Sequence, residues 1–200
     1  LRSGTGGSHA PDVVVQNALL AEIRLGDGTH QQQNFIGYGQ SLRKDKFVMS
    51  GVAGTYNVHI SNGTDNVFVG TIANGAGTAN FRDETGGGNS FVSTHGWGLY
   101  DQVTATSTPP QYGYWLTGHG ACTDCKQDEA SVSGMLLSGF GVTVNGGQLQ
   151  FVNTPLTGVC GITLGSTATT TSHNINLPKI FNLAPDQYVC YTLSELNLGK

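Results

Sequence analysis

Apolar and polar residues alternate over short stretches of the chain with a period of two residues. Tyr56, Val58 and Ile60 alternate with polar residues in residues 54–60, and the same alternation returns in residues 140–151. Successive side chains of a strand point to opposite faces, so this period predicts strands with one buried face. No apolar pattern of helical period is secure over an ordinary helix length. The sequence therefore predicts an all-β protein with little helix.

Asn-Gly and Gly-Gly steps separate the alternating stretches. The main ones are Asn62-Gly63, Asn74-Gly75 and Asn145-Gly146-Gly147. Asn and Gly tolerate the positive φ of tight turns, so we expect hairpin turns at residues 62–64, 74–77 and 145–147. Strands joined by hairpins pair in antiparallel sheets. The expected fold is an antiparallel β-sandwich of the immunoglobulin-like or jelly-roll-like kind.

The chain divides into a short leader and a long β region. Residues 1–11 are rich in Gly and Ser and are expected to form a flexible N-terminal arm. Residues 12–200 are expected to form the β-sandwich. One continuous sandwich fits this region, and so do two halves that divide near residues 86–110, where a Gly-rich break and a Pro-Pro loop interrupt the strand pattern.

An apolar segment follows the leader and extends to residue 25. A helix over residues 12–24 competes with a strand, but Gly26-Asp27-Gly28 ends the segment like a turn, so we favour the strand. With no turn that folds it straight back, this strand is expected to add to the sheet edge of another copy. The alternative is an ordinary first strand in its own sheet. The residues expected at the contact between copies are Val13, Val14, Val15, Leu19 and Ile23.

Low charge is the main compositional feature. Only 11% of the residues are charged, against about a quarter in a typical soluble domain. The net charge of -4 gives no basic field, and the basic run of residues 43–46 is interrupted by an acid, so nucleic-acid binding is not expected. Thr, Ser, Asn, Gln and 30 Gly residues supply the polarity instead. This composition favours secreted, adhesive or self-assembling proteins.

The beginning of the chain also bears on location. Residue 1 is Leu rather than Met, so we expect a secreted, extracellular protein that has lost its targeting segment. Deliberate truncation is the alternative. No apolar run approaches the length of a membrane-spanning helix, so no membrane span is expected.

Four cysteines lie in the C-terminal half: Cys122, Cys125, Cys160 and Cys190. Their even number predicts two structural disulfide bonds. The two cysteines of a CxxC in extended structure are poorly placed to bridge each other, so we expect Cys122 and Cys125 each to pair with Cys160 or Cys190. A zinc site and free or redox-active thiols are the alternatives, although the chain lacks a second close pair of ligands.

The candidate chemistry does not favour an enzyme. The six His residues show no metal-ligand spacing, and there is no Gly-x-Ser-x-Gly motif. The adjacent acids Asp83-Glu84 and Asp128-Glu129 would point to opposite faces of a strand. His119, close to the CxxC, could join a His/Cys cluster, but a surface loop flanked by glycines is the preferred interpretation. No catalytic residue, metal or cofactor is expected.

Aromatic residues gather in one part of the chain and could stack on sugar rings. The candidates are Trp97, Tyr100, Tyr112, Tyr114 and Trp115. The alternative is that they lie in the core or at a subunit interface, since large aromatics contribute much of the buried area in both. Asn62-Gly63-Thr64 is a formal N-glycosylation acceptor at an expected turn.

One stretch resembles a known family. In residues 47–81, Gly54-Thr55-Tyr56-Asn57-Val58 and Val69-Gly70-Thr71-Ile72 are followed by a Gly-rich segment that ends at Phe81. This pattern resembles immunoglobulin-like β-sandwich modules of secreted bacterial surface and filament proteins. The resemblance implies a β-sandwich with an adhesive or filament role, and it transfers no catalytic residue.

These observations lead to a non-enzymatic structural protein as the expected function. We expect an extracellular subunit that self-assembles into a filament, pilus or coat, with large interfaces depleted of charge. Its partners would be further copies of the chain. The alternative is a carbohydrate-binding or cell-adhesion module with a glycan as its partner. An enzyme on a β scaffold, with metal at the Cys/His cluster, is a third hypothesis.

Overall fold

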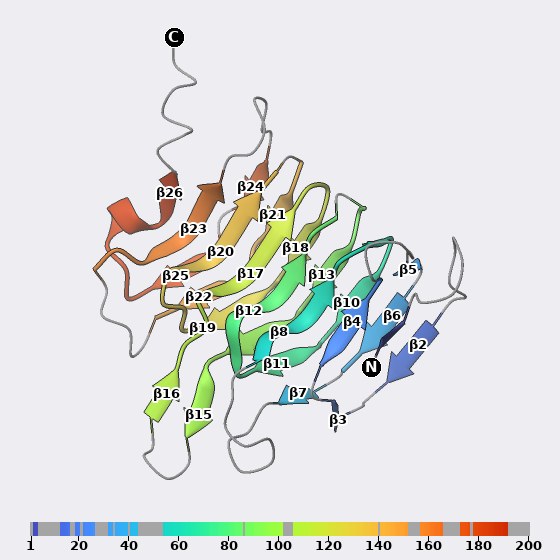
Figure 1. The fold of residues 1–200 in the computed structure, drawn as a ribbon. Coiled ribbons are helices and arrows are strands. Elements are labelled where there is room, and N and C mark those ends of the chain that lie inside the picture. The colour runs from blue at the N-terminus through green and yellow to red at the C-terminus, as the bar shows by residue number, and fades with distance from the viewer. Residues whose placement is uncertain are drawn as a thin grey trace.

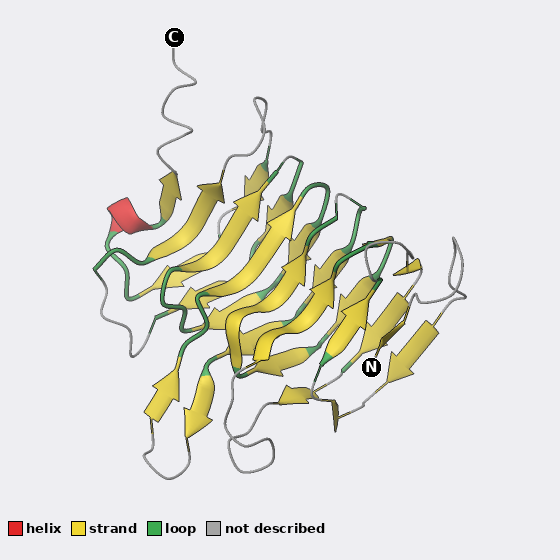
Figure 2. Cartoon of the chain, viewed as in Figure 1, coloured by secondary structure: helices red, strands yellow, loops and turns green. Residues whose placement is uncertain are grey.

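The computed structural model describes most of the chain. The described residues are 2–3, 13–16, 19–20, 22–26, 32–33, 35–39, 41–43, 54–85, 87–101, 106–139, 141–151, 157–165, 173–176 and 178–191. Strands dominate this part, and a single 3₁₀ turn, Pro185–Gln187, is its only helical element (Figure 2). The prediction of an all-β protein with little helix is confirmed for the described residues.

Three parallel sheets, which we name A, B and C, form the body of the molecule. Sheet A contains β1 (Arg2–Ser3), β4 (Ile23–Leu25), β8 (Gly54–Ile60), β12 (Ala76–Asp83), β17 (Tyr112–Thr117), β20 (Ser133–Ser138), β23 (Cys160–Gly165) and β26 (Val189–Tyr191). Sheet B contains β2 (Val13–Gln16), β6 (Phe35–Tyr38), β10 (Val67–Val69), β13 (Ser90–Val92), β18 (Ala121–Thr123), β21 (Thr143–Asn145) and β24 (Asn174–Asn176). Sheet C contains β3 (Leu19–Leu20), β7 (Ser41–Arg43), β11 (Ile72–Asn74), β14 (His95–Trp97), β19 (Lys126–Asp128), β22 (Gln148–Gln150) and β25 (Lys179–Phe181).

The chain visits the sheets in the repeating order B, C, A and so builds a parallel β-solenoid (Figure 1). Each circuit of three strands is one rung. Every strand of the three sheets pairs in parallel with the equivalent strand of the next rung. The predicted antiparallel β-sandwich is therefore wrong, and so is the sandwich fold that the family resemblance implied. Neighbours in space come from successive rungs, not from successive strands.

The expected hairpin turns are corners of the solenoid. Residues 62–64 lie between β8 of sheet A and β10 of sheet B, and residues 145–147 lie between sheets B and C. Gly75, with φ of 83°, turns the chain from sheet C to sheet A. Gly75, Gly146 and Gly147 have the positive φ that was expected, whereas none of residues 62–64 does and Asp65 has it instead. The strands beside each turn belong to different sheets. The turn positions were predictable, whereas the pairing across them was not.

The corner between sheets B and C is the tightest, because only two residues separate the strands. Its first residue is left-handed in five rungs: Gly39, Gly70, Ser93, Asp124 and Gly146 have φ between 48° and 65°. In three of the described rungs the second residue turns its side chain inward, since Thr71, Thr94 and Cys125 are all fully buried. This corner thus directs a row of small side chains into the core.

Rows of inward side chains fill the interior. In sheet A, one row is formed by Ile23, Val58, Phe81, Tyr114, Met135 and Ile162, all fully buried. Aromatic rings stack between rungs, with centroids 4.7 Å apart for Phe81 and Tyr114 and 5.4 Å apart for Phe68 and Phe91. Most of the described short strands of sheets B and C bury their central residue and turn the two flanking residues outward. This accounts for the period-two pattern of the sequence.

The N-terminal segment pairs with its own chain. β2 lies beside β6 and β3 beside β7, and Ile23 of β4 is fully buried in the core. Within the expected flexible arm, Arg2–Ser3 forms β1 and pairs with β4, while residues 4–11 lie outside the described part. The described part of this segment takes the arrangement of an ordinary first strand in its own sheet.

Two small ribbons accompany the three sheets. β15 (Leu99–Asp101) and β16 (Thr106–Thr108) form an antiparallel pair that extends away from the solenoid (Figure 1). β5 (Gln32–Gln33) pairs in parallel with β9 (Gly63–Thr64) near the corner between sheets A and B. The strands before and after residues 86–110 belong to the same three sheets.

Candidate functional site

A groove of about 770 Å³ lies over the corner between sheets B and C and the beginning of the sheet C strands. It crosses five rungs. Its lining residues are Gly70, Ile72, Ser93, His95, Asp124, Lys126, Gly146, Gly147, Gln148 and Lys179. We call it the sheet C groove.

Strand register, not sequence proximity, assembles the floor of this groove. Ile72 pairs with His95, His95 with Lys126, Lys126 with Gln148, and Gln148 with Lys179. Adjacent strands lie about 4.8 Å apart, so the row of five residues extends about 19 Å along the solenoid axis. The groove is therefore elongated, and it runs across the strands.

A second outward row runs beside the first, two residues further along each strand. It consists of Asn74, Trp97, Asp128, Gln150 and Phe181, of which Asn74 is buried and the other four are at least partly exposed. His95 Nε2 lies 2.9 Å from Asp128 Oδ2 on the next rung, and the His95 ring meets Trp97 edge to face at 4.9 Å. Phe181 is 43% exposed. Together the two rows present aromatic, amide, basic and acidic side chains on one face.

Amide groups continue this face in the middle of the groove. Gln148 Nε2 donates to Gln150 Oε1 at 3.0 Å on the same strand, and both side chains are partly exposed. Each amide keeps further donor or acceptor capacity beyond this bond. The pair can therefore exchange hydrogen bonds with a polar ligand that lies in the groove.

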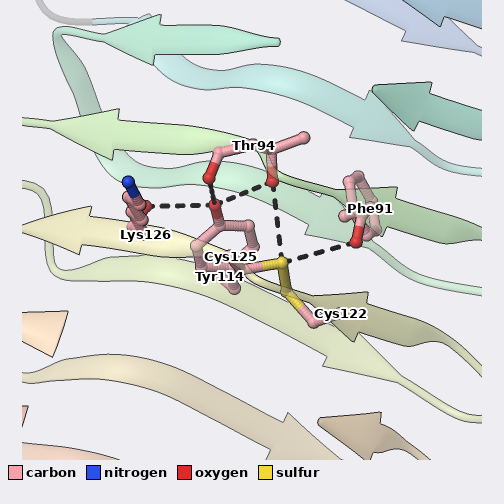
Figure 3. The surroundings of a disulfide bond; sticks show 6 residues. All are labelled: Phe91, Thr94, Tyr114, Cys122, Cys125 and Lys126. Carbon is pink, nitrogen blue, oxygen red and sulfur yellow. Dashed lines mark hydrogen bonds between the residues drawn. A yellow bond between two sulfur atoms is a disulfide. The ribbon is translucent and has the colours of Figure 1, made fainter. Parts of the chain in front are cut away.

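Buried polar side chains hold the groove strands from behind. The Tyr114 hydroxyl lies 3.0 Å from the Thr94 carbonyl oxygen, 3.1 Å from that of Lys126 and 2.9 Å from Thr94 Oγ1 (Figure 3). Burial raises the pKa of Tyr114 above its ordinary value, so this hydroxyl stays a neutral donor. These bonds anchor the starts of the strands that carry His95 and Lys126.

Gln127 provides a similar support under Trp97. Its Oε1 accepts from Asn80 Nδ2 at 3.2 Å, and Asn80 also donates to the Trp97 carbonyl oxygen at 3.1 Å. Gly96 and Gly113 leave space for this side chain, because a Cβ at either would approach Gln127 within 2.4 Å. The backbone beneath Trp97 is thereby fixed by buried hydrogen bonds.

Cys122 and Cys125 form a disulfide bond at the corner beside the groove (Figure 3). The sharp turn at Asp124 brings their Cα atoms to 5.7 Å, and both cysteines are fully buried. The expected pairing of each with Cys160 or Cys190 is wrong, because the CxxC spans a corner and is not extended. The bridge ties the central residue of β18 to the residue that precedes Lys126.

The second disulfide bond joins Cys160 and Cys190 of the neighbouring strands β23 and β26. Two bridges within residues 122–190 were predicted, and their number is confirmed. Within the described residues, no group of three His, Cys, Asp or Glu side chains is arranged to hold a metal ion.

The aromatic candidates separate in the structure. Trp97 lies on the outer face of sheet C, whereas Tyr112 and Trp115 lie half-buried on the outer face of sheet A. Tyr114 is fully buried and belongs to the core. Tyr100 lies on β15, and its side chain is outside the described part. The five residues therefore do not form one platform.

A compact cluster around Arg82 occupies the outer face of sheet A. Its guanidinium lies 4.0 Å from the Trp115 ring centroid, donates to Thr117 Oγ1 at 2.9 Å and lies 3.4 Å from Glu84. Burial lowers the pKa of Arg82 relative to its ordinary value. Trp115 Nε1 donates to Ser138 at 2.9 Å. Arg82 and Trp115 are thus largely engaged with side chains of their own sheet, although Arg82 Nε is buried without a hydrogen-bond partner.

The remaining sequence candidates lie away from the groove. Asn62 is half-buried at the corner after β8, and His119 is exposed between β17 and β18. Val14 of β2 is 57% exposed, and Val15 packs partly against the core. The side chains of Val13 and Leu19 are outside the described part.

Most of the groove residues were not candidates in the sequence. His95, Lys126, Gln148 and Lys179 follow one another in the row at separations of 22 or 31 residues, and no short motif joins them. The only signal available in the sequence was a repeated pattern. A residue such as Gly, Ser or Asp, which takes the left-handed conformation at the corner, is followed by a small residue and then by a strand of three residues. Trp97 was the one residue of this face that sequence analysis selected.

Comparison with known proteins gives no assignment. No family model, curated protein or solved structure matches the chain. None of the described helices is long and apolar enough to cross a membrane.

Proposed function

We propose that the chain is a non-enzymatic, extracellular β-solenoid that binds a linear glycan along the sheet C groove. The observation that carries this proposal is the shape of the groove, which crosses five rungs and is lined by one in-register row of side chains. A ligand of matching shape is extended and repeats along its length. A polysaccharide chain has both properties.

The chemistry of the face also suits sugars. A sugar ring offers hydroxyl groups around its rim and apolar C–H surfaces on its faces. Gln148, Gln150 and His95 can exchange hydrogen bonds with hydroxyls, and Trp97 and the exposed Phe181 provide aromatic surface for the ring faces. Buried hydrogen bonds hold the backbone behind Trp97 and Lys126, so part of this surface is organised before a ligand binds.

Two disulfide bonds support an extracellular location, because such bonds persist in oxidising compartments. The low content of charged residues fits a surface that exchanges hydrogen bonds with neutral polar groups.

A binding experiment with matched aromatic variants tests the proposal. Trp97→Ala removes the aromatic ring of the groove face, and Tyr191→Ala removes a 61% exposed ring from sheet A as the control. Against a panel of immobilised polysaccharides, we expect Trp97→Ala to weaken binding at least about tenfold, as stacked aromatic contacts do in comparable sites. Tyr191→Ala is expected to bind like the unmodified chain. Equal binding by all three proteins would contradict the proposal.

Self-assembly into a filament, pilus or coat is the second candidate, and the position of β2 favours it. β2 is the end strand of sheet B and pairs with β6 on one side, with no described strand on its other side. An edge strand offers unpaired backbone groups to another chain. Deletion of residues 1–17 should leave smaller particles by size exclusion and electron microscopy if this edge mediates assembly. Unchanged assembly would exclude the edge from that role.

A further inference from the structure

We propose that the sheet C groove selects an acidic glycan, with Lys126 and Lys179 binding its negative groups. This inference rests on the proposed function and adds the charge class of the ligand. Both lysines line the groove and are exposed. Strand register places them in the same row, on either side of Gln148.

These two lysines differ from the other described basic side chains in that they form no ion pair with a described carboxylate. The structure describes the surroundings of four Lys and Arg side chains. Arg24 is paired with Glu22 and Arg82 with Glu84. Lys126 and Lys179 make no ion pair with a described carboxylate. The two unpaired cations of the described structure therefore lie in the same groove.

Two acids lie at or beside the groove, Asp124 in its lining and Asp128 in the second row. Asp128 is bonded to His95 on the preceding rung, which leaves its carboxylate partly satisfied. Asp124 lies at the corner, where its Oδ1 would be 3.2 Å from a Cβ on Gly146 of the next rung. Asp124 is therefore exposed in the groove lining, in the corner row, whereas the lysines lie in the adjacent strand row.

The spacing of the lysines suits a repeating polyanion. Two strand spacings separate them, which is about 9 to 10 Å along the solenoid axis. This is comparable with the length of a disaccharide, so an acidic sugar at every second position of a linear chain could meet both ammonium groups. Gln148 between them can bond hydroxyls of the intervening sugar. The ligand class is therefore a linear polysaccharide with carboxylate or sulfate groups.

The test compares charged and neutral forms of the same glycans. Alginate, polygalacturonate, hyaluronan and chondroitin sulfate are used as probes, each beside its carboxyl-reduced or desulfated form. The unmodified chain should bind at least one acidic form more tightly than its neutral form, and salt should weaken that binding. Lys126→Gln and Lys179→Gln should each weaken binding of the acidic form about tenfold and leave the neutral form unchanged. Arg24→Gln, which removes a cation outside the groove, is the control and should bind like the unmodified chain.

The outcomes separate this inference from the proposed function. Equal binding of acidic and neutral forms, or lysine variants that bind like Arg24→Gln, would overturn the acidic-glycan inference. If Trp97→Ala still reduced binding in that case, the proposed function would stand. Absence of binding to every probe would overturn both.

Discussion

Asp83 is the one acidic residue in a row of apolar side chains. Its sheet A neighbours in register are Ile60 and Leu116, both fully buried, and Asp83 is buried with them. Thr85 donates to its Oδ1 through the backbone N–H at 3.0 Å and the hydroxyl at 2.9 Å, and Asn89 Nδ2 donates to its Oδ2 at 3.1 Å. Burial nevertheless dominates and raises the pKa of Asp83 to about 6.

This carboxyl group should make the stability of the protein depend on pH. Unfolded chains lose the Asp proton near pH 4, whereas the folded chain keeps it to about 6. Between these values the folded state binds more protons, so stability falls as pH rises. The favourable contribution is complete below about pH 4 and is lost by the time the pH has passed 6, a loss of up to about 3 kcal/mol.

Urea unfolding from pH 3.5 to 7 checks this expectation when it is compared with Asp83→Asn. The variant carries no titrating group at this position. The unfolding free energy of the unmodified chain minus that of the variant should therefore fall as the pH rises through this window. The Asn side chain also places an amide near Asn89. This changes the unfolding free energy of the variant by the same amount at every pH, so the pH dependence of the difference still reports on Asp83. A difference that stays constant from pH 3.5 to 7 would show that Asp83 ionises normally.

Two glycines with positive φ allow the loss of stability caused by a side chain to be compared between a crowded and an open position. Gly147 has φ of 99°, and a Cβ there would lie 2.1 Å from the Cys125 carbonyl oxygen. Gly158 has φ of 79° and open space around the same position. Gly158→Ala should cost about 1 to 2 kcal/mol from backbone strain alone. Gly147→Ala should cost at least about 3 kcal/mol, because overpacking against backbone adds to the strain.

Chemical denaturation of the two glycine variants measures this difference. Equal losses of stability would mean that the corner between sheets B and C has room for a side chain at residue 147, contrary to the close contact described above.

At the scale of single elements, the two disulfide bonds close loops of different length. Cys122 and Cys125 are three residues apart, and Cys160 and Cys190 are 30 apart. In the chain-entropy description, a longer loop restricts the unfolded state more strongly. The Cys160–Cys190 bond should therefore contribute about 3 to 4 kcal/mol and the Cys122–Cys125 bond about 2 kcal/mol.

Paired substitutions to Ala separate these contributions. We expect Cys160→Ala with Cys190→Ala to lower the free energy of unfolding more than Cys122→Ala with Cys125→Ala, measured under non-reducing conditions. A larger loss from the second pair would show that packing of the buried bridge at the corner outweighs loop entropy.

The elements themselves were predictable from local pattern, and their partners were not. A three-residue strand that buries its central residue has the same period as a strand of a sandwich, and a solenoid corner uses the same Asn and Gly residues as a hairpin. Local sequence therefore predicted strands at residues 54–60 and turns at residues 62–64. It contained no signal for pairing between strands of successive rungs.

At the scale of the whole molecule, the number of residues in a rung varies, and this variation hides the repeat in the sequence. Paired residues of sheet B are separated by 22, 31, 23, 31, 22 and 31 residues from one rung to the next. The longer rungs carry extra residues between sheets C and A, such as the β15–β16 ribbon and residues 151–159. This alternation, with little identity between rungs, explains why no repeat was recognised.

The candidate site could not be predicted from the sequence for the same reason. His95, Lys126 and Gln148 become neighbours only through the register of successive rungs. Trp97 was found because an aromatic residue is a signal by itself. Residues of ordinary type, such as Gln148, acquire a role only when the fold places them in a row.

Engineered cross-linking tests the register of the solenoid directly. Thr143 and Asn174 are paired, outward-facing and 31 residues apart in sequence. Neighbouring strands bring Cα atoms to about 5 Å, within the range that a disulfide bond spans. We expect Thr143→Cys with Asn174→Cys to form this bridge, detected by mass spectrometry of non-reduced peptides. Thr143→Cys with Asn176→Cys is out of register by two residues and should not bridge, and an equal yield from both pairs would contradict the register.

The central claim is that a glycan lies along the sheet C groove, and nuclear magnetic resonance mapping tests it most directly. Backbone amide shifts of the labelled 20.9 kDa chain are recorded during titration with an oligosaccharide of a polysaccharide that the chain binds. We expect the largest changes at His95, Lys126, Gln148 and Lys179, in one line across four rungs, and at Trp97 beside them. Amides on the outer face of sheet A, such as those of Arg82 and Thr163, should move little. Changes centred on sheet A, with the sheet C row unaffected, would contradict the account.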